Sequence, residues 1–371
     1  MVRVLQTDNY GMSFNSPRFS RHELIRTKFF PLRKVWTPLD GLAVWLPRSS
    51  GYDLIHSFNR IPLTRKPWIV TFEAELPRTI GDTTGKIKQF LRRRLTLDNC
   101  RQIIAMSDYA KFKFIEYNRD WNLLEAVTKK IEIIHPNIPI KASQPKTYDK
   151  TQPLQILFVG NHFARKGGIV ALRLAKKAKA AGLPIVMHIV SQMAYGNNIY
   201  TDHPNQKLYK EDIELLSLDN IVFHGKQPNQ VVMELMARSH FIILMSLHDT
   251  YGYSVIEGFS VATPAIVTNV CALPEFVYHN HNGYVIPLQL NQKEWIHLSQ
   301  RGDSDEYWDI LHKTYEDLAE HTLQVLAAKI FENPANYESL SLGALAQAQK
   351  LHNTQKTSEK LDSLYDQLVN R

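Results

Sequence analysis

The sequence predicts an α/β protein with two doubly wound domains, each built around a parallel sheet. Short apolar runs bounded by turn residues recur along the chain, which is typical of buried parallel strands. In the second half, two of these runs lead through a glycine-bearing loop into a helix, at residues 154–181 and 241–261. Between the halves, residues 141–153 are polar, contain two prolines and show no apolar periodicity, which predicts a linker.

Length and composition indicate the number of domains and the compartment. A chain of 371 residues with 44% hydrophobic and 22% charged residues is long enough for two domains that each bury a core. No apolar run approaches the length of a membrane span, and the N-terminus lacks the apolar stretch of a secretory signal. Cys100 and Cys271 are far apart and without metal-ligand spacing. We therefore expect a cytoplasmic protein.

Positive charge is concentrated in the first half. Residues 1–150 hold 26 Lys and Arg against 14 Asp and Glu, a net charge of +12, whereas the rest of the chain has a net charge of −4. So basic a half favours an anionic partner, such as a lipid headgroup, a phosphorylated acceptor or a nucleic acid. A basic surface with no particular partner is the alternative.

The first domain begins with a predicted strand at Val2–Leu5 and a turn-rich loop that contains Gly11. The carboxyl end of such a strand borders the ligand crevice, so Gly11 is a candidate to line it; a plain surface loop is the alternative. Further strands are predicted at 41–45, 53–58 and 68–72. Glu73 and Glu75 follow the last of these, either as ligand-binding carboxylates or as solvated loop residues.

A basic amphipathic helix is predicted at 86–95, with apolar side chains at helical spacing and cations on the other face. Such a helix can lie on an anionic membrane or pack on its own sheet. A strand at 102–106 then leads to Ser107, which is expected to cap a helix at 109–117. The last strand of the domain is predicted at 130–134.

The second domain opens with a strand at 154–160 and a loop that carries Arg165 and Lys166 before a helix. Two cations beside a helix N-terminus suit a pyrophosphate, because their charges add to the helix dipole. Cations solvated at the start of a helix are the alternative.

The stretch from Phe241 to Thr268 predicts a strand, a loop, a helix and a second strand. Asp249 and Glu257 bracket the helix N-terminus, where unpaired N–H groups favour an anion. Two carboxylates would repel a lone phosphate, but they can hold hydroxyls on either side of a pyrophosphate. The pattern therefore predicts a nucleotide-sugar site.

These residues carry a family resemblance. Asp249-x7-Glu257, with Gly252 between and Thr263-Pro264 after, resembles the donor signature of glycosyltransferase family 4, the retaining group 1 enzymes of the GT-B fold. Asp249 stands where the family usually has a glutamate, and Cys271-Ala272 where it often has two glycines. The resemblance is close over residues 154–290 and in outline before them.

The resemblance implies the architecture and the site. Two Rossmann-like domains would face each other across a cleft, the first (1–140) binding the acceptor and the second (154–300) the nucleotide sugar. Residues 301–371 would form C-terminal helices, at 305–332 and 338–370, the last packing on the first domain. The implied donor residues are Gly160, Asn161, Arg165, Lys166, Lys226, Gln227, Asp249, Tyr251, Gly252, Tyr253, Ser254 and Glu257. The implied acceptor side contains Gly11, Glu73, Glu75 and Ser107.

The predicted function is transfer of a sugar from a UDP- or GDP-sugar to a hydroxyl of a glycan or lipid-linked acceptor. Glu257 would bind the ribose and Asp249 the sugar, while Arg165, Lys166 and the amides of residues 251–254 hold the pyrophosphate. Glu73, after its strand, would orient the acceptor hydroxyl or the donor sugar. No cofactor or metal is expected, because fixed cations and a helix dipole can stabilise the leaving diphosphate.

Other classes fit the sequence less well. G-x-G-x-x-G after a strand, Walker A, G-x-S-x-G and H-E-x-x-H are absent. Asp303-Ser-Asp305 resembles a metal motif, but a helix cap explains it better. A non-catalytic protein that binds sugar nucleotides or glycans on the same fold remains an alternative. Nucleic acid is not expected, because no binding module is present; contact with an anionic inner membrane face is allowed by the basic first half.

Overall fold

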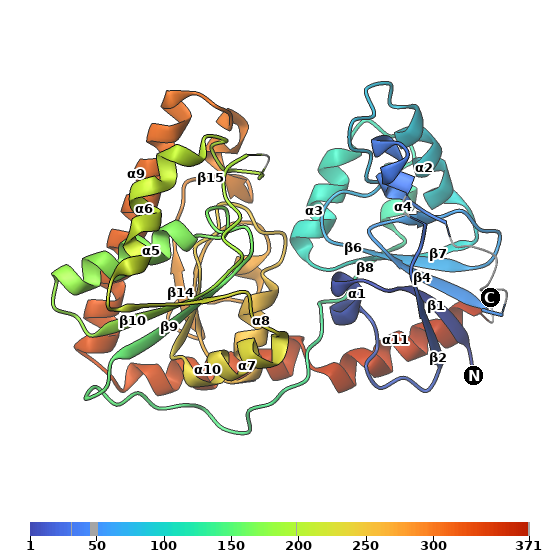
Figure 1. Ribbon diagram of the computed structural model, residues 1–371. Coiled ribbons are helices and arrows are strands. Elements are labelled where there is room, and N and C mark those ends of the chain that lie inside the picture. Colours follow the sequence, from blue (N-terminus) through green and yellow to red (C-terminus); the bar gives the residue numbers. More distant parts are fainter. Residues whose placement is uncertain (31, 45–50, 198, 370–371) are drawn as a thin grey trace. The chain divides into compact units, whose positions relative to one another are not determined.

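The computed structural model describes residues 1–30, 32–44, 51–197 and 199–369, which form two compact units (Figure 1). Unit 1 contains Met1–Pro139 and the C-terminal segment from His352, and unit 2 contains Ile140–Leu351. Within each unit the described residues form a six-stranded parallel sheet flanked by helices. The chain is thus an α/β protein with two Rossmann-like domains.

Unit 1 has the strand order β2-β1-β4-β6-β7-β8. The strands are β1 Arg3–Thr7, β2 Glu23–Thr27, β4 Leu54–Phe58, β6 Trp68–Phe72, β7 Cys100–Ala105 and β8 Ile131–Ile133, with the short pair β3 Leu42–Ala43 and β5 Ile61–Pro62 beside them. The helices are α1 Tyr10–Asn15, α2 Lys86–Thr96, α3 Asp108–Tyr117, α4 Leu124–Thr128 and α11 Thr354–Val369, and the 3-10 turns are η1 Leu32–Lys34 and η2 Thr37–Gly41.

Unit 2 has the strand order β11-β10-β9-β12-β13-β14. The strands are β9 Leu154–Val159, β10 Ile185–Val190, β11 Ile221–Gly225, β12 Phe241–Leu244, β13 Ala265–Thr268 and β14 Gly283–Ile286, followed by the hairpin β15 Leu290–Asn291 and β16 Glu294–Trp295. The main helices are α5 Gly168–Ala180, α6 Lys210–Glu214, α7 Asn229–Arg238, α8 Tyr253–Ser260, α9 Asp305–Leu326 and α10 Asn336–Leu351. The short turns are η3 Gln206–Tyr209, η4 Leu215–Ser217, η5 Leu273–Glu275, η6 Ile296–Gln300 and the π-helical turn η7 Ala327–Phe331.

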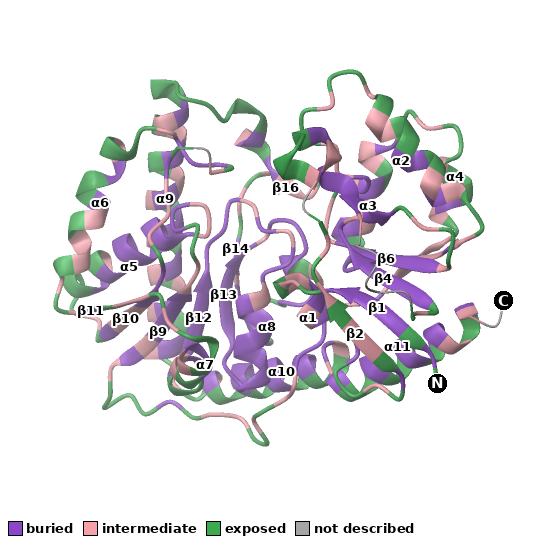
Figure 2. Cartoon of the chain, turned by 45° about the vertical axis from the view of Figure 1, so that its right-hand side comes forward, coloured by how far each residue is buried: buried purple, intermediate pink, exposed green. Residues whose placement is uncertain are grey.

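Burial follows the sheets. In Figure 2 the inner strands are buried, whereas the edge strands β2 and β11 are only partly buried and the outer faces of the helices are exposed. The buried apolar runs predicted at 53–58, 68–72, 154–160 and 241–245 are confirmed as inner strands. The strand β2 escaped prediction because an exposed edge strand needs no apolar run.

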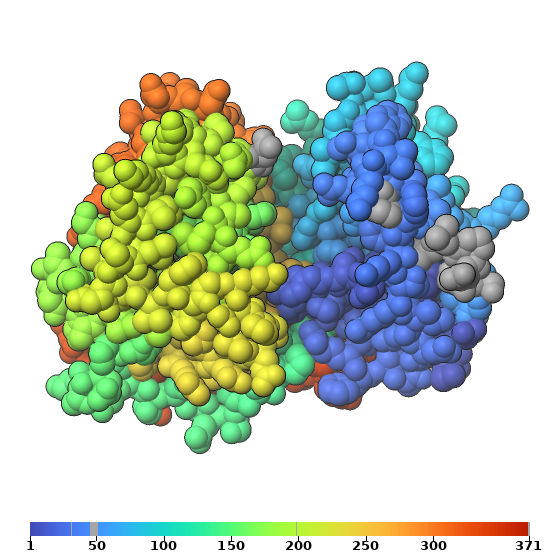
Figure 3. Space-filling view, in the orientation of Figure 1, coloured from blue at the N-terminus to red at the C-terminus, as the bar shows by residue number. Residues whose placement is uncertain are grey.

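A surface segment of unit 1 lies beside α2. In Figure 3 the residues of η1 and η2 (blue) adjoin those of α2 (light blue), and Gly41 at the end of η2 lies against Leu91 of α2. The predicted strand at 41–45 is shorter than expected, because only Leu42–Ala43 pairs with β5; Trp45 lies outside the described residues.

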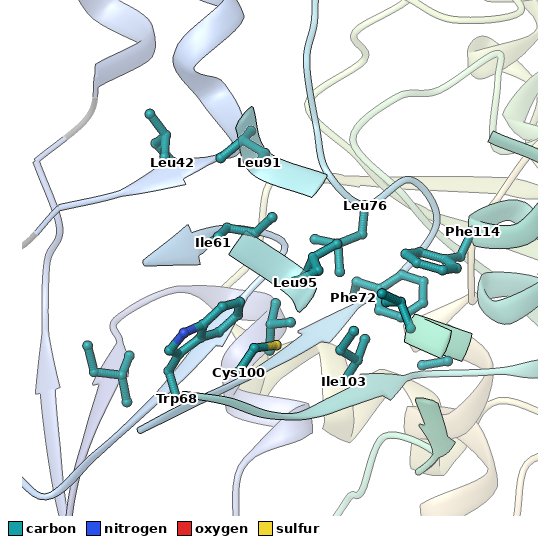
Figure 4. Close-up of a cluster of buried hydrophobic side chains, with 14 of the residues drawn as sticks. Leu42, Ile61, Trp68, Phe72, Leu76, Leu91, Leu95, Cys100, Ile103 and Phe114 are labelled. Carbon is teal, nitrogen blue, oxygen red and sulfur yellow. The ribbon is translucent and has the colours of Figure 1, made fainter. Parts of the chain in front are cut away.

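The core of unit 1 lies on both faces of its sheet. On one face, strand residues such as Trp68, Phe72 and Ile103 pack against Leu91 and Leu95 of α2 (Figure 4). Alternate strand residues point to the other face, where they meet Leu361, Leu364, Tyr365 and Leu368 of α11. The basic amphipathic helix predicted at 86–95 is therefore confirmed, with its apolar stripe on the sheet.

Two helical expectations are wrong. The loop after the first strand contains α1, because Asn9 Oδ1 accepts a hydrogen bond from the Met12 N–H (2.8 Å) and caps it, and Met12 and Phe14 are buried. The helix expected at 338–370 is two helices, α10 and α11. It breaks at His352, whose Nδ1 lies 2.8 Å from the Pro136 carbonyl oxygen, and Asn353 Oδ1 then accepts the Lys356 N–H (3.0 Å).

The polar segment predicted as a linker is fixed to unit 2 by Lys146. This half-buried amino group donates to Thr263 Oγ1 (2.5 Å) and to carbonyl groups at the end of α7, where cations are favoured. Burial lowers the pKa of Lys146 to about 7. The carbonyl acceptors are Met236 (3.2 Å), Ala237 (2.9 Å) and Ser239 (2.7 Å).

Candidate functional site

The loops after β9 and β12 flank the topological switch point of unit 2. From β9 the chain moves outward through β10 and β11, whereas from β12 it moves the other way through β13 and β14. The two loops therefore emerge side by side at the carboxyl edge of the sheet, where α/β proteins bind ligands. Most of the donor residues predicted from the sequence lie in these two loops.

The loop after β9 approaches the end of β12 closely through Gly167. Its φ of +88° is left-handed, and a Cβ there would lie 2.5 Å from the Met245 carbonyl oxygen. At Gly160, a Cβ would lie 2.8 Å from Lys166 Cδ. The two glycines thus allow the Lys166 side chain to lie along the loop and reach the neighbouring one.

Lys166 reaches across the switch point to Asp249. Its Nζ lies 2.8 Å from Asp249 Oδ2, and Asp249 is only 6% exposed. Burial opposes ionisation of this carboxyl, but the charges of Lys166 and Arg165 prevail and hold the pKa of Asp249 well below its usual range. The Asp249 carboxyl is therefore ionised at neutral pH.

Asp249 also organises the loop before α8. Its Oδ1 accepts hydrogen bonds from the N–H groups of Gly252 (3.0 Å) and Tyr251 (3.4 Å). The sequence predicted that the amides of 251–254 bind a pyrophosphate, but the first two donate to Asp249 in this structure. At the helix start, Ser254 Oγ is buried and has no hydrogen-bond partner among the described residues.

Arg165 connects the same two loops. Its Nη1 donates to the His248 carbonyl oxygen (2.6 Å), and its Nη2 lies 3.2 Å from His162 Nδ1. Its own carbonyl accepts the Leu247 N–H (3.2 Å). Arg165, Lys166 and Asp249 are thus brought together as a cluster of two cations and one carboxylate.

Glu257 faces a different neighbour. It is 5% exposed, one turn inside α8, and its Oε1 accepts from Asn229 Nδ2 (3.1 Å) at the start of α7. Asp249 therefore contacts the loop after β9, whereas Glu257 contacts the start of α7.

The side chains of several other predicted donor residues lie outside the cluster of Arg165, Lys166 and Asp249. Asn161 and Lys226 are exposed, and Gln227 Nε2 turns back to the His224 carbonyl oxygen (2.5 Å). The Tyr251 ring stacks on Phe276 inside the core, with centroids 5.0 Å apart, so only its backbone faces the loop. Tyr253 is partly exposed at the first position of α8.

In unit 1, Glu73 is held at the carboxyl edge of the sheet. Its Oε1 accepts from Asn59 Nδ2 (3.0 Å) and from the Arg78 guanidinium, and its N–H donates to Asn59 Oδ1 (3.0 Å). Gly11 lies in α1, at the switch point between β1 and β4, where a Cβ would lie 2.3 Å from the Phe58 ring. Packing against Phe58 therefore explains why position 11 holds a glycine.

The two remaining acceptor candidates lie elsewhere in unit 1. Ser107 is fully buried and its Oγ accepts the Ala110 N–H (2.9 Å), so it caps α3 as predicted. Glu75 is exposed and lines a cavity of about 480 Å³ together with Lys88, Lys113, Glu116, Tyr117, Arg119 and Asp120. The structure therefore separates Glu75 from the Glu73 cluster.

Sequence reasoning missed three residues of unit 2 that support the donor candidates: Asn229, His248 and Glu294. In unit 1 it missed Arg78, which binds Glu73 within the loop after β6. Within the described ranges, no three His, Cys, Asp or Glu side chains gather as a metal site. Ser304 Oγ caps α9 by accepting the Tyr307 N–H (3.2 Å), in the middle of the Asp303-Ser-Asp305 motif. None of the described helices has the length and apolar character of a membrane span.

The close approach at Gly167 gives a testable expectation. Gly167→Ala should destabilise unit 2 and displace the loop that carries Lys166, because the Cβ meets backbone and the φ is left-handed. Gly182→Ala is the matched control, since Gly182 has a φ of +67° but nothing within 4 Å. We expect a cost of about 1–2 kcal/mol for the control and a clearly larger one at Gly167, measured by denaturant unfolding. Equal costs would contradict this account.

Comparisons with known proteins agree with the site. Residues 140–324 match the sequence profile of the family described as "Glycosyl transferases group 1". The N-acetyl-alpha-D-glucosaminyl L-malate synthase of Bacillus anthracis is 36% identical over 67 residues, which are 18% of this chain and 17% of that protein.

Solved structures resemble the whole chain. HepE of Anabaena in complex with UDP aligns over 99% of this chain and 100% of its own, with a TM-score of 0.64 and 12% identity. Sucrose-phosphate synthase from Thermosynechococcus elongatus aligns over 99% of both chains, with a TM-score of 0.60 and 16% identity. The chain therefore belongs to the group 1 glycosyltransferases, through its second unit, and it has the GT-B fold.

Proposed function

We propose that this glycosyltransferase moves a sugar from a nucleotide-sugar donor to a hydroxyl of a glycan or lipid-linked acceptor, with retention of configuration and without a divalent metal. The observation that carries the proposal is the Lys166–Asp249 ion pair across the switch point, beside Arg165 and the start of α8. UDP-sugars are the favoured donors, because HepE was solved with UDP; GDP-sugars are the second class.

The residues of unit 2 have distinct roles in this proposal. Arg165 and Lys166 bind the diphosphate and stabilise the negative charge that develops on it as the sugar leaves. Glu257 accepts hydrogen bonds from the ribose hydroxyls. Asp249 accepts hydrogen bonds from the hydroxyls of the transferred sugar. Because the leaving diphosphate can itself help remove the acceptor proton, no protein nucleophile is needed.

In unit 1, Glu73 is the proposed acceptor-orienting residue. The Arg78 guanidinium and the Asn59 amide fix its carboxylate at the carboxyl edge of the sheet. A carboxylate held in this way can accept a hydrogen bond from an acceptor hydroxyl without a further loss of side-chain conformational entropy.

The test is a donor screen by calorimetry and nucleotide release. UDP-, GDP- and ADP-sugars are compared in EDTA and in Mg²⁺. We expect one class to bind and turn over equally in both. Binding without turnover on a broad acceptor panel would favour a non-catalytic binding protein, and absence of binding would refute the donor site.

We also propose that unit 1 contacts an anionic membrane. Val35 and Trp36 are 72% and 54% exposed and directly follow Arg33 and Lys34. On the neighbouring α2, Phe90 is 45% exposed. Exposed aromatic and aliphatic side chains among cations suit a negatively charged lipid surface.

Vesicle co-sedimentation checks this contact. Wild type is expected to bind vesicles rich in phosphatidylglycerol, but not pure phosphatidylcholine, and Val35→Ser/Trp36→Ser to bind several-fold less. Leu342→Ser is the control, because Leu342 is equally exposed (54%) on unit 2. Unchanged binding of the double variant would contradict this surface.

A further inference from the structure

The His248 side chain joins three loops behind the donor site. Its Nε2 lies 3.5 Å from Glu294 Oε1 on β16, and it is hydrogen-bonded to Cys271 in the loop after β13. The Tyr200 ring, from the loop after β10, packs edge-on against the imidazole with centroids 4.9 Å apart. One half-buried ring thus connects the loop after β12 to three neighbouring segments.

The backbone of the same residue supports the charged cluster. The His248 carbonyl accepts from Arg165 Nη1 (2.6 Å) and Ser246 Oγ (3.2 Å), and the next residue is Asp249. Any shift of His248 would therefore move both the carbonyl oxygen that accepts from Arg165 and the neighbouring Asp249 carboxylate.

Cys271 adopts an unusual backbone conformation in the loop after β13. Its backbone is left-handed, with φ of +54°. Such a conformation is unfavourable for a residue with a side chain. Here it is offset by contacts: the Cys271 N–H donates to the Lys293 carbonyl (2.7 Å), and the thiol reaches His248.

The imidazole is charged at neutral pH. Burial lowers its pKa, but hydrogen bonds to Cys271 and Glu294 outweigh burial and raise the pKa of His248 to about 9. The other groups that face it are Arg165, Asp249 and Tyr200, and its charge also helps to keep Asp249 ionised.

We propose that His248, Cys271 and Glu294 form a positioning unit of the donor site, in which the His248 ring, paired with Glu294, holds Arg165 and Asp249 in place and adds positive charge beside Arg165 and Lys166 for the diphosphate. This inference rests on the proposed donor site. It assigns no bond-making step to His248: the residue acts through the placement of Arg165 and Asp249 and through its charge.

The experiment measures UDP affinity from pH 6.5 to 10 for wild type, His248→Asn, Glu294→Gln and Cys271→Ser. Wild-type affinity should fall as pH rises through about 9, where the imidazolium loses its proton. His248→Asn should lack this step and bind about 5–10-fold more weakly at pH 7, as expected for one partly screened charge. Glu294→Gln should keep the step but shift it to lower pH, and Cys271→Ser should keep a step because the imidazole is still present.

The outcomes separate this inference from the donor proposal. If wild type binds no UDP at any pH, the donor site itself is refuted. If wild type binds and His248→Asn has the same affinity and pH profile, the positioning unit is refuted. A step lost in Cys271→Ser but kept in His248→Asn would identify the thiol as the titrating group and also overturn it. Glu294→Gln decides the question if His248→Asn does not fold.

Discussion

Lys166→Ala is expected to reduce sugar-nucleotide turnover by about 10²–10³-fold, which is the cost of removing one preorganised charge from a leaving-group site. The substitution also leaves the Asp249 carboxylate, 6% exposed, without the cation 2.8 Å away. A buried charge that loses its partner is costly, so we also expect lower stability. The measurement is nucleotide release with the donor found in the screen, together with thermal unfolding.

The control for Lys166→Ala is Lys179→Ala on α5. Lys179 Nζ lies 2.8 Å from Asp219 Oδ1, the same length, but the two side chains are 47% and 77% exposed. Exposed pairs of this kind contribute about 0–1 kcal/mol, so both turnover and stability should change little. Similar losses in the two variants would show that Lys166 acts only as an ordinary surface cation.

Glu257→Ala is expected to weaken the binding of both UDP and uridine, because the proposed contact is to the ribose, which the two ligands share. Losing one charged hydrogen-bond acceptor at a buried site should lower affinity by about 10–100-fold. Lys166→Ala should weaken UDP but leave uridine unchanged, because uridine has no phosphate. Ligand-observed NMR with both ligands on both variants separates the two roles.

The control for Glu257→Ala is Glu234→Gln on α7, where Glu234 is exposed and its Oε1 accepts from Gln230 Nε2 (3.3 Å). It should bind both ligands as wild type does. A Glu257→Ala variant that keeps full uridine affinity would place the ribose elsewhere and reverse the orientation of the donor.

Much of the second unit could be predicted from local sequence. Apolar runs of strand length, such as Phe241–Met245, and glycine-bearing loops before helices depend on neighbours in the chain, so β9, α5, β12 and α8 appear where expected. The signals for Ser107 as a cap and for α2 as an amphipathic helix are equally local. Gly167 lies in the predicted glycine-bearing loop after β9, but the reason for its size is the Met245 carbonyl, which comes from a distant strand end.

The sequence by itself therefore determined the α/β class and the residues gathered around two strand-to-helix loops, because periodicity and turn chemistry act over a few residues. Only the tertiary structure decided their partners. Strand order places β9 beside β12, which brings Lys166 to Asp249, and it places α7 where Asn229 meets Glu257. The same holds for Glu294, which meets His248 from 46 residues further along the chain. These pairs depend on which segments the whole fold brings together, which no local pattern encodes.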